Sequence, residues 1–334
     1  MTEARTEPLP GTSANFRGSP VYHRLLAFSG LIVLFIGFSI ASSNFYQTAN
    51  IINILQATSV NGVLAVAATL VIISGGIDLS VGTLMTFCSV MAGVFITNWG
   101  LPIWIGVPGA LLVGLASGAV SGVFIAKLKI PPFIATLGMM LIYKGLSLAI
   151  CGAKPIYFTG TPDFIKISTG SVIGAVIPGV PIPNGVVILF AVAGLAAFIL
   201  ARTALGRFTF AMGSNEEALR LSGVNIDGWK IAIYALAGCV CGVAGILIAS
   251  RINSAQPSIG QGYELDAIAA VVIGGTSLSG GRGTMLGTMI GALIISVVAN
   301  GLRILSVPQE WQIVVTGSII IVAVYADILR RRRA

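Results

Sequence analysis

Charged side chains are scarce in this chain, and so are the residues that build most catalytic and metal sites. Asp, Glu, Lys and Arg make up 9% of the 334 residues, whereas soluble domains carry about 25%. Histidine occurs once, at His23, and the cysteines Cys88, Cys151, Cys239 and Cys241 lack the spacing of metal ligands. A phosphate-binding G-x-x-x-x-G-K-[ST] loop is missing as well. We therefore expect no metal, no bound cofactor and no catalytic centre in this chain.

Long hydrophobic segments are abundant in this chain. Hydrophobic residues make up 56% of the sequence, and the mean hydropathy is +0.97. A helix that crosses about 30 Å of hydrocarbon needs about 20 predominantly apolar residues. We therefore predict an all-α polytopic membrane protein. About ten segments fit as transmembrane helices: residues 24–43, 51–73, 80–97, 102–126, 132–151, 184–202, 229–250, 264–279, 283–304 and 309–329. The eighth is short and begins with charge, so it is either a full span or a broken, re-entrant element.

The distribution of Lys and Arg predicts the orientation. Most of the 19 basic residues fall in segments that lie inside when both termini are cytoplasmic. The predicted organisation is a disordered tail over residues 1–22, a membrane domain over 23–329 and a basic tail over 330–334. An extracytoplasmic loop (152–183) and a cytoplasmic loop (203–228) are long enough to carry function. The net charge of +8 then reflects topology and contact with anionic lipid, and we expect no nucleic-acid partner.

Two apolar runs end in the same eight-residue motif. Residues 75–82 and 274–281 both read G-G-x-x-L-S-x-G. A repeated glycine break between hydrophobic segments marks the substrate path of many membrane transporters. On the predicted spans the two copies are parallel, and an inverted repeat would require the eighth segment to be miscounted. The repeat glycines are Gly75, Gly76, Gly82, Gly274, Gly275 and Gly281.

Two further glycine series have a four-residue spacing. Each places a stripe of glycine along one face of a helix, which favours close helix packing. We interpret both as structural. They are Gly114, Gly118 and Gly122 on one span, and Gly283, Gly287 and Gly291 on another.

The cytoplasmic loop contains the pattern of a short capped helix. Ser214 or Asn215 can cap its N-terminus, two acidic residues complement the helix dipole there, and Gly223 is a natural stop. Such a short helix is not stable alone in water, so we expect it to dock against a partner or to lie on the membrane. The candidate docking residues are Ser214, Asn215, Glu216, Glu217, Ala218, Arg220, Leu221 and Gly223.

This stretch, G-S-N-E-E-A at 213–218 and L-S-G-V-N at 221–225, resembles the coupling segment of ribose-type permease subunits of bacterial ABC importers. Further stretches match the same family in the same order, from about residue 45 to 325. They are residues 59–61, 76–82, 133–140, 254–257 and 262–272.

The resemblance implies the rest of a transport machine. Such permeases have a type II ABC importer-like fold, pair as dimers in the bacterial inner membrane and bind separate ATPase subunits, which use ATP and Mg. A periplasmic sugar-binding protein delivers the sugar, for which ribose or a related pentose is the expectation here. The helix at 214–222 would couple the ATPase to the membrane spans.

Polar residues within the predicted spans are candidates for the translocation path or its gate. Asp78 is expected to cap or gate a broken helix, although sugar contact and ion pairing with Lys144, Arg251 or Arg282 stay open. One of the two acids of the eighth segment is expected to pair with Arg251 and the other to line the pore. The candidate path residues are Asn61, Asp78, Ser80, Asn253, Gln256, Glu264, Asp266 and Ser279.

Two other classes of protein compete with the permease prediction. An ion-driven secondary transporter would also contain an internal repeat and intramembrane acids, but it leaves the docking helix unexplained. A membrane-embedded enzyme would need a cluster of catalytic side chains, and only Glu264 and Asp266 lie close together in the sequence. We therefore predict an importer permease without its own ATPase site.

Overall fold

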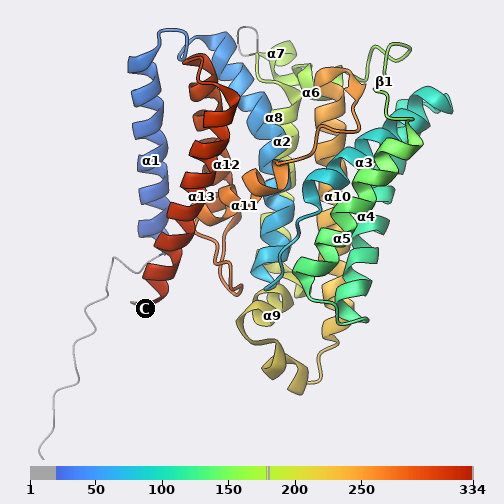
Figure 1. Cartoon of the computed structure of the whole chain (residues 1–334), viewed down its shortest axis with the longest axis vertical. Helices are drawn as coiled ribbons and strands as arrows, with labels where there is room; N and C mark the ends of the chain where they lie inside the picture. Colours follow the sequence, from blue (N-terminus) through green and yellow to red (C-terminus); the bar gives the residue numbers. More distant parts are fainter. Residues whose placement is uncertain (1–19, 178, 180, 333–334) are drawn as a thin grey trace, which may run out of the picture.

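The computed structural model describes residues 20–332 except residues 178 and 180, and it is almost entirely helical (Figure 1). Its first half contains α1 (Pro20–Ala41), α2 (Thr48–Ile73), α3 (Val81–Gly93), the π-helical turn η2 (Val94–Asn98), α4 (Ile103–Ala126), α5 (Pro132–Ile150), β1 (Ile156–Tyr157), α6 (Lys166–Thr169) and α7 (Val172–Val176). Its second half contains α8 (Asn184–Arg202), α9 (Ala204–Leu221), α10 (Ile226–Ile252), β2 (Ser254–Ala255), α11 (Tyr263–Ile273), α12 (Met285–Ile304) and α13 (Gln309–Arg332).

The long helices confirm the polytopic prediction. Seven described helices are long and apolar enough to cross a membrane, and α1 and α13 add the shorter apolar stretches Ala27–Ala41 and Gln309–Tyr325. The start of α1 and the end of α13 lie at the same end of the molecule as α9 (Figure 1). Of the predicted N-terminal tail over 1–22, residues 1–19 lie outside the described residues, and residues 20–22 begin α1. Of the predicted basic tail over 330–334, residues 330–332 belong to α13.

The predicted eighth segment is broken and is not one continuous spanning helix. In its place α11 has 11 residues, which gives a length of about 16 Å, half of the hydrocarbon thickness. The helix ends at Ile273 because the glycines that follow it leave the helical conformation, and Gly275 has a φ of +84°. Residues 256–262 lead from the end of α10 to the start of α11, and the loop after α11 contacts Gly213 of α9, at the end of the molecule where α10 begins. The segment therefore passes from one end of the molecule to the other and is not re-entrant.

The two glycine motifs end their helices with the same hydrogen bonds. After α2, Gly75 N–H donates to the Ile72 carbonyl at 3.0 Å and Gly76 N–H donates to the Val71 carbonyl at 3.1 Å. After α11, Gly275 N–H and Thr276 N–H make the equivalent bonds at 2.9 and 3.1 Å. Both are Schellman caps around a left-handed glycine. Both α2 and α11 run antiparallel to α12, so the two copies are parallel (Figure 1).

Backbone contacts hold α4 against α10. A Cβ atom at Gly114 would meet the carbonyl oxygen of Gly238, and one at Gly118 would meet that of Tyr234. The second glycine series does the same between α12 and α11, where Gly287 lies against Gly274. The first series, and Gly287 with Gly291 of the second, are therefore confirmed as features that let helices pack without intervening side chains. Gly283 precedes α12 and faces the side chains of Thr276 and Ile73.

Polar side chains, by contrast, join α2 to α12. Thr69 and Thr288 share a hydrogen bond of 2.7 Å near one end of the pair. Near the other end, Asn300 Nδ2 donates to Asn50 Oδ1 at 2.9 Å. All four side chains are buried. Because an unpaired polar group is costly in a lipid-surrounded interior, these two bonds favour one fixed alignment of the helices.

Candidate functional site

The segment predicted as a cytoplasmic loop is mostly helix. Within α9 the backbone leaves the helical conformation at Asn215, with φ −161° and ψ 98°, which divides α9 into a long first part and a short second part. Asn215 Oδ1 accepts a hydrogen bond from Ala218 N–H at 2.9 Å, so Asn215 and not Ser214 caps the short helix. Gly223, with φ +79°, follows its end as predicted.

Two of the predicted docking residues are engaged within the chain. Glu216 binds Arg220 at 3.1 Å along its own helix and Lys230 of α10 at 2.7 Å. Partial burial raises the pKa of Glu216, but hydrogen bonds and the positive charges of Lys230 and Arg220 outweigh burial and leave the pKa below its usual value. The carboxylate therefore fastens the short helix to α10.

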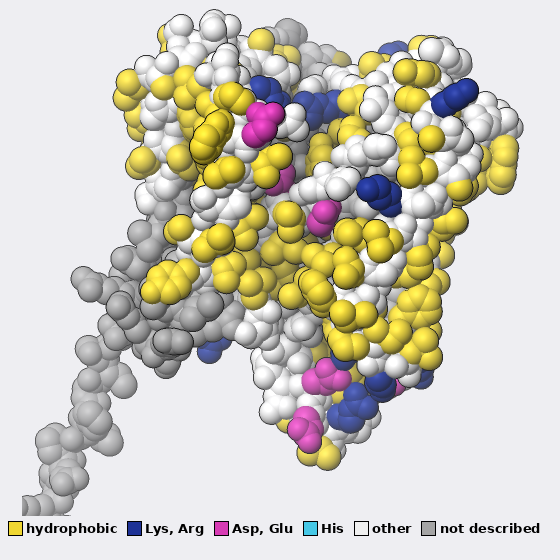
Figure 2. Space-filling view, in the orientation of Figure 1, with side chains coloured by type: hydrophobic (Ala, Val, Ile, Leu, Met, Phe, Trp, Pro, Cys, Tyr) yellow, Lys and Arg dark blue, Asp and Glu magenta, His cyan; other side chains and the backbone are white. Residues whose placement is uncertain are grey.

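The outer surface of the short helix is apolar at its tip. Leu221 is 85% exposed, and Glu217 and Ala218 are exposed beside it. Figure 2 shows acidic and basic side chains gathered at this end of the molecule, beyond the hydrophobic band of the spans. Leu221 is therefore an exposed apolar side chain among charged ones at this end of the molecule.

Asp78 closes a tight turn just before α3. Its Oδ1 accepts hydrogen bonds from the Ser80 N–H at 2.8 Å and from the Ser80 hydroxyl at 2.6 Å. Thr136 of α5 contacts the residues on both sides of Asp78. Its hydroxyl accepts a hydrogen bond from Leu79 N–H and donates one to the Ile77 carbonyl, both at 3.2 Å. Asp78 and Ser80 are buried. Because Ser80 is the N-cap residue and no side chain caps α3, Asp78 stabilises the turn before the helix and does not cap the helix as predicted.

The expected ion pair of Arg251 with an acid of α11 is absent among the described residues. Glu264 turns back instead, and both of its carboxylate oxygens lie 3.1 Å from the Gly262 N–H at the start of α11. Glu264 is buried, while Asp266 is partly exposed. The carboxylate of Glu264 therefore satisfies the backbone of the turn before α11, which sequence charge alone does not reveal.

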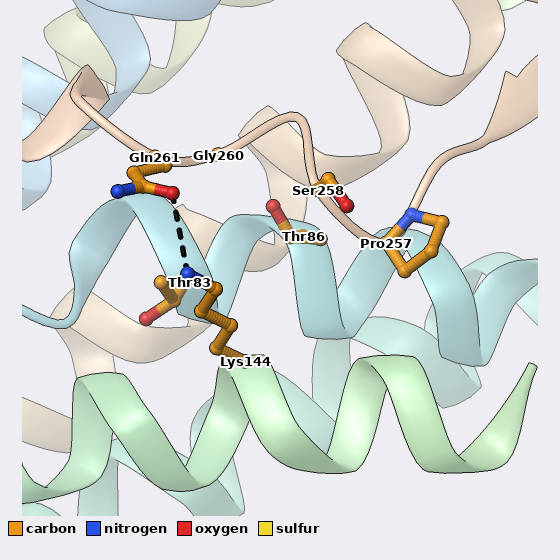
Figure 3. A pocket seen from close by; sticks show the side chains of 7 residues that line it. All are labelled: Thr83, Thr86, Lys144, Pro257, Ser258, Gly260 and Gln261. Carbon is orange, nitrogen blue, oxygen red and sulfur yellow. Dashed lines mark hydrogen bonds between the residues drawn. The ribbon is translucent and has the colours of Figure 1, made fainter. Parts of the chain in front are cut away.

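The starts of α3 and α11 meet beside a small crevice (Figure 3). A Cβ atom at Gly82 would meet the Gly260 carbonyl oxygen and lie 2.6 Å from a carboxylate oxygen of Glu264. The crevice has a volume of about 10 Å³, roughly the room for one water molecule. Its lining is Thr83, Thr86, Lys144, Pro257, Ser258, Gly260 and Gln261.

Lys144 and Gln261 were not predicted as path residues. Lys144 lies on α5, and its ammonium group donates to Gln261 Oε1 at 3.2 Å across the crevice (Figure 3). A lysine within a membrane helix is itself a sign of a polar cavity or pathway, because its charge is costly in hydrocarbon. The sequence contains this signal, although charge alone predicts only that Lys144 is a partner for acids.

The remaining predicted path residues are spread over several places. Asn61 lies on α2 and is partly exposed, and Ser279 lies in the loop between α11 and α12. Asn253 ends α10 in the left-handed conformation, where its carbonyl accepts from Phe158 N–H at 3.3 Å. Gln256 donates weakly to Ser254 at 3.4 Å. The structure therefore gathers only the residues around the α3 and α11 starts into one site.

Comparison with known proteins identifies the class to which this fold belongs. Residues 50–324 match the family described as "Branched-chain amino acid transport system / permease component". The chain belongs to this family of membrane permeases. No solved structure matches the chain significantly.

Curated relatives narrow the comparison. The chain is 44% identical to the ribose import permease protein RbsC of Escherichia coli over 89% of this chain and 91% of that protein. It is 42% identical to the RbsC protein of Haemophilus influenzae over 90% and 92%, and 37% identical to the fructose import permease protein FrcC of Rhizobium meliloti over 89% and 83%. These matches confirm the resemblance to ribose-type ABC permease subunits.

Proposed function

We propose that this chain is the permease subunit of an ATP-driven importer and forms the path of a monosaccharide across the bacterial inner membrane, with both termini in the cytoplasm. A pentose such as ribose is the proposed substrate. Relatives named for ribose import reach 40 to 44% identity over nearly the full chain, and those named for xylose or fructose transport reach 33 to 37%. These sugar permeases support a sugar substrate over the amino acids in the family's description.

The short helix at the tip of α9 carries this proposal. Its apolar tip at Leu221 would enter a groove of a separate ATPase subunit, which binds ATP and Mg and supplies the energy. The permease itself would hydrolyse nothing and hold no cofactor. A short amphipathic helix is a common form of protein docking element.

The path would lie against the crevice where α3 and α11 begin, closed by a second copy of the chain. Thr83, Lys144 and Gln261 offer hydroxyl, ammonium and amide groups that can hydrogen-bond a neutral polyol. A periplasmic sugar-binding protein would deliver the sugar at the opposite end of the molecule. There β1 pairs with β2 and anchors the loop over residues 152–183 to the end of α10.

The docking surface can be tested by placing a charge at its apolar tip. Leu221→Glu should abolish co-purification of the ATPase subunit and ATP-driven ribose uptake, because a carboxylate would be buried in the groove. Leu128→Glu is the matched control, since Leu128 is also an exposed leucine (61%), in the turn between α4 and α5. Undiminished co-purification of the Leu221→Glu variant would exclude this helix as the docking site.

A further inference from the structure

Three stretches that lie far apart in the sequence meet at the end of α2. They are Gly75, just after α2, Gly213, at the end of the first part of α9, and Gly280 with Gly281, in the loop between α11 and α12. A Cβ atom on Gly280 would lie 2.9 Å from the Cα atoms of both Gly213 and Gly75. A hydrogen bond of 2.9 Å from Gly281 N–H to the Ile73 carbonyl joins the loop to α2.

Gly213 sits at the centre of this glycine junction. A Cβ atom there would meet the Ile73 carbonyl oxygen and the Gly281 nitrogen, and a Cβ atom on Gly75 would lie 3.6 Å from the Gly213 Cα atom. The α9 backbone therefore touches both copies of the repeated motif. The contact involves backbone atoms only. Since backbone atoms cannot change rotamer to absorb a displacement, movement of Gly213 must shift its neighbours.

The junction lies beside the docking helix. Only Ser214 and Asn215 separate Gly213 from the short helix that begins after Asn215. Ser214 also touches the junction, because a Cβ atom on Gly281 would lie 3.1 Å from the Ser214 Cα atom. A movement imposed on the short helix therefore reaches the junction within two residues.

The docking helix has a second attachment of a different kind. The ion pair between Glu216 and Lys230 joins it to α10 through two long, partly exposed side chains. Such a pair can stretch and reorient, whereas the glycine junction cannot. The stiffer connection leads to α2 and the α11–α12 loop, and α2 is in turn held to α12 by the Thr69–Thr288 and Asn50–Asn300 hydrogen bonds.

We propose that Gly75, Gly213, Gly280 and Gly281 form a rigid junction that transmits movement of the docking helix to α2 and α12, so that closure of the ATPase moves this helix pair. The glycines are positioning residues and touch neither sugar nor nucleotide. The inference rests on the proposed function, because it assumes that an ATPase moves the short helix. It also gives the repeated motif a role, because residues of both copies build the contact.

The test replaces glycines of the junction by alanine and compares each variant with a control glycine that has open space around it. Gly280→Ala would press on Gly213 and Gly75, whereas Gly275→Ala has nearly the same backbone strain (φ +84° against +83°) and nothing within 4 Å. Gly213→Ala would likewise press on the α2 end, whereas Gly138→Ala adds a methyl group in open space on α5. Each variant is purified with its ATPase subunit, reconstituted in liposomes with the sugar-binding protein, and assayed for ribose uptake and ATP hydrolysis in parallel.

We expect Gly280→Ala and Gly213→Ala to keep the ATPase bound and hydrolysing while ribose uptake per ATP falls about tenfold, in the range of typical coupling between sites. Both control variants should match the natural chain. Uptake per ATP unchanged in the two junction variants would overturn the proposal. So would failure of both to assemble while the controls assemble, since the contact would then serve folding. Absence of ATP-driven uptake in the natural complex would instead refute the proposed function.

Discussion

Two helix pairs at the centre of this permease are held together by opposite means. The α4–α10 pair is joined by bare backbone, with glycines facing carbonyl oxygens along the contact. The α2–α12 pair is joined by buried side-chain hydrogen bonds near its two ends. Backbone contact tolerates no added atoms, while polar pairs fix the register and can be removed at modest cost. The α4–α10 pair is therefore a rigid support. The α2–α12 pair beside it is aligned so that it can move as one unit.

The largest expected effect comes from adding volume to the backbone contact. Gly118→Leu should lower the free energy of unfolding by about 3 kcal/mol or more, because even its Cβ atom meets the Tyr234 carbonyl oxygen. Thermal unfolding of the purified protein in detergent measures this loss. Gly138→Leu is the control and should change stability by less than about 0.5 kcal/mol, since nothing lies within 4 Å of its added Cβ. Equal melting of the two variants would remove the distinction between the helix pairs.

A smaller effect is expected from breaking a polar bond of the α2–α12 pair. Asn300→Leu should cost about 1–3 kcal/mol, because the buried Asn50 side chain loses a partner and cannot reach water. Replacing both residues by leucine should restore part of that stability, since neither polar group is then left unpaired. Unfolding by denaturant measures all three variants. A double variant no more stable than Asn300→Leu would show that the bond does not align the helices.

A weaker bond of the same kind joins the two threonines. Thr69→Val and Thr288→Val keep the side-chain shape and remove the hydroxyl groups that share the 2.7 Å hydrogen bond. A double-mutant cycle should give a coupling energy of about 0.6 kcal/mol, the average for such bonds in membrane proteins. Purely additive losses would mean that the hydroxyl groups do not interact.

The smallest expected effect concerns the ion pair that ties the docking helix to α10. Lys230→Met should destabilise the protein by less than about 1 kcal/mol, because the pair is partly exposed and screened by salt. The folded-state pKa of Glu216 is lowered, so the contribution of this pair is present at neutral pH and is lost as the pH falls below the ordinary glutamate range of about 4.3. Melting temperatures of both proteins between pH 3 and pH 7 should therefore converge at the acidic end. A difference that grows towards low pH would contradict the sign of this shift.

The sequence predicted the spans well and the short elements poorly. The start of α5 at Pro132 and of α8 at Asn184 follow from prolines next to long apolar runs, which are local signals. The end of α11 does not, because the predicted span continues to residue 279, beyond the glycines that follow Ile273. Only the left-handed conformation of Gly275 shows that the helix has already ended.

The candidate site divides in the same way. The stop at Gly223 was predictable because it depends on residues within a few positions. The expected capping by Asp78 was wrong, because its carboxylate binds Ser80 before α3 begins. The ion pair of Glu216 with Lys230 was not predictable, because Lys230 lies on α10, beyond the turn that follows the short helix. The expected pair with Arg251 was wrong because opposite charge indicates a possible partner without saying where the backbone brings it. Lys144 and Gln261 meet across 117 positions, a distance that no local pattern spans.

The energy source of uptake tests the central claim most directly. Ribose uptake is measured in cells that carry this chain with its ATPase and sugar-binding partners, with a proton uncoupler present and ATP maintained. The account predicts uptake that survives the uncoupler and stops with vanadate, because ATP hydrolysis by a separate subunit drives the permease. Uptake that stops with the uncoupler and survives vanadate would mean an ion-driven carrier and would contradict both the docking helix and the junction behind it.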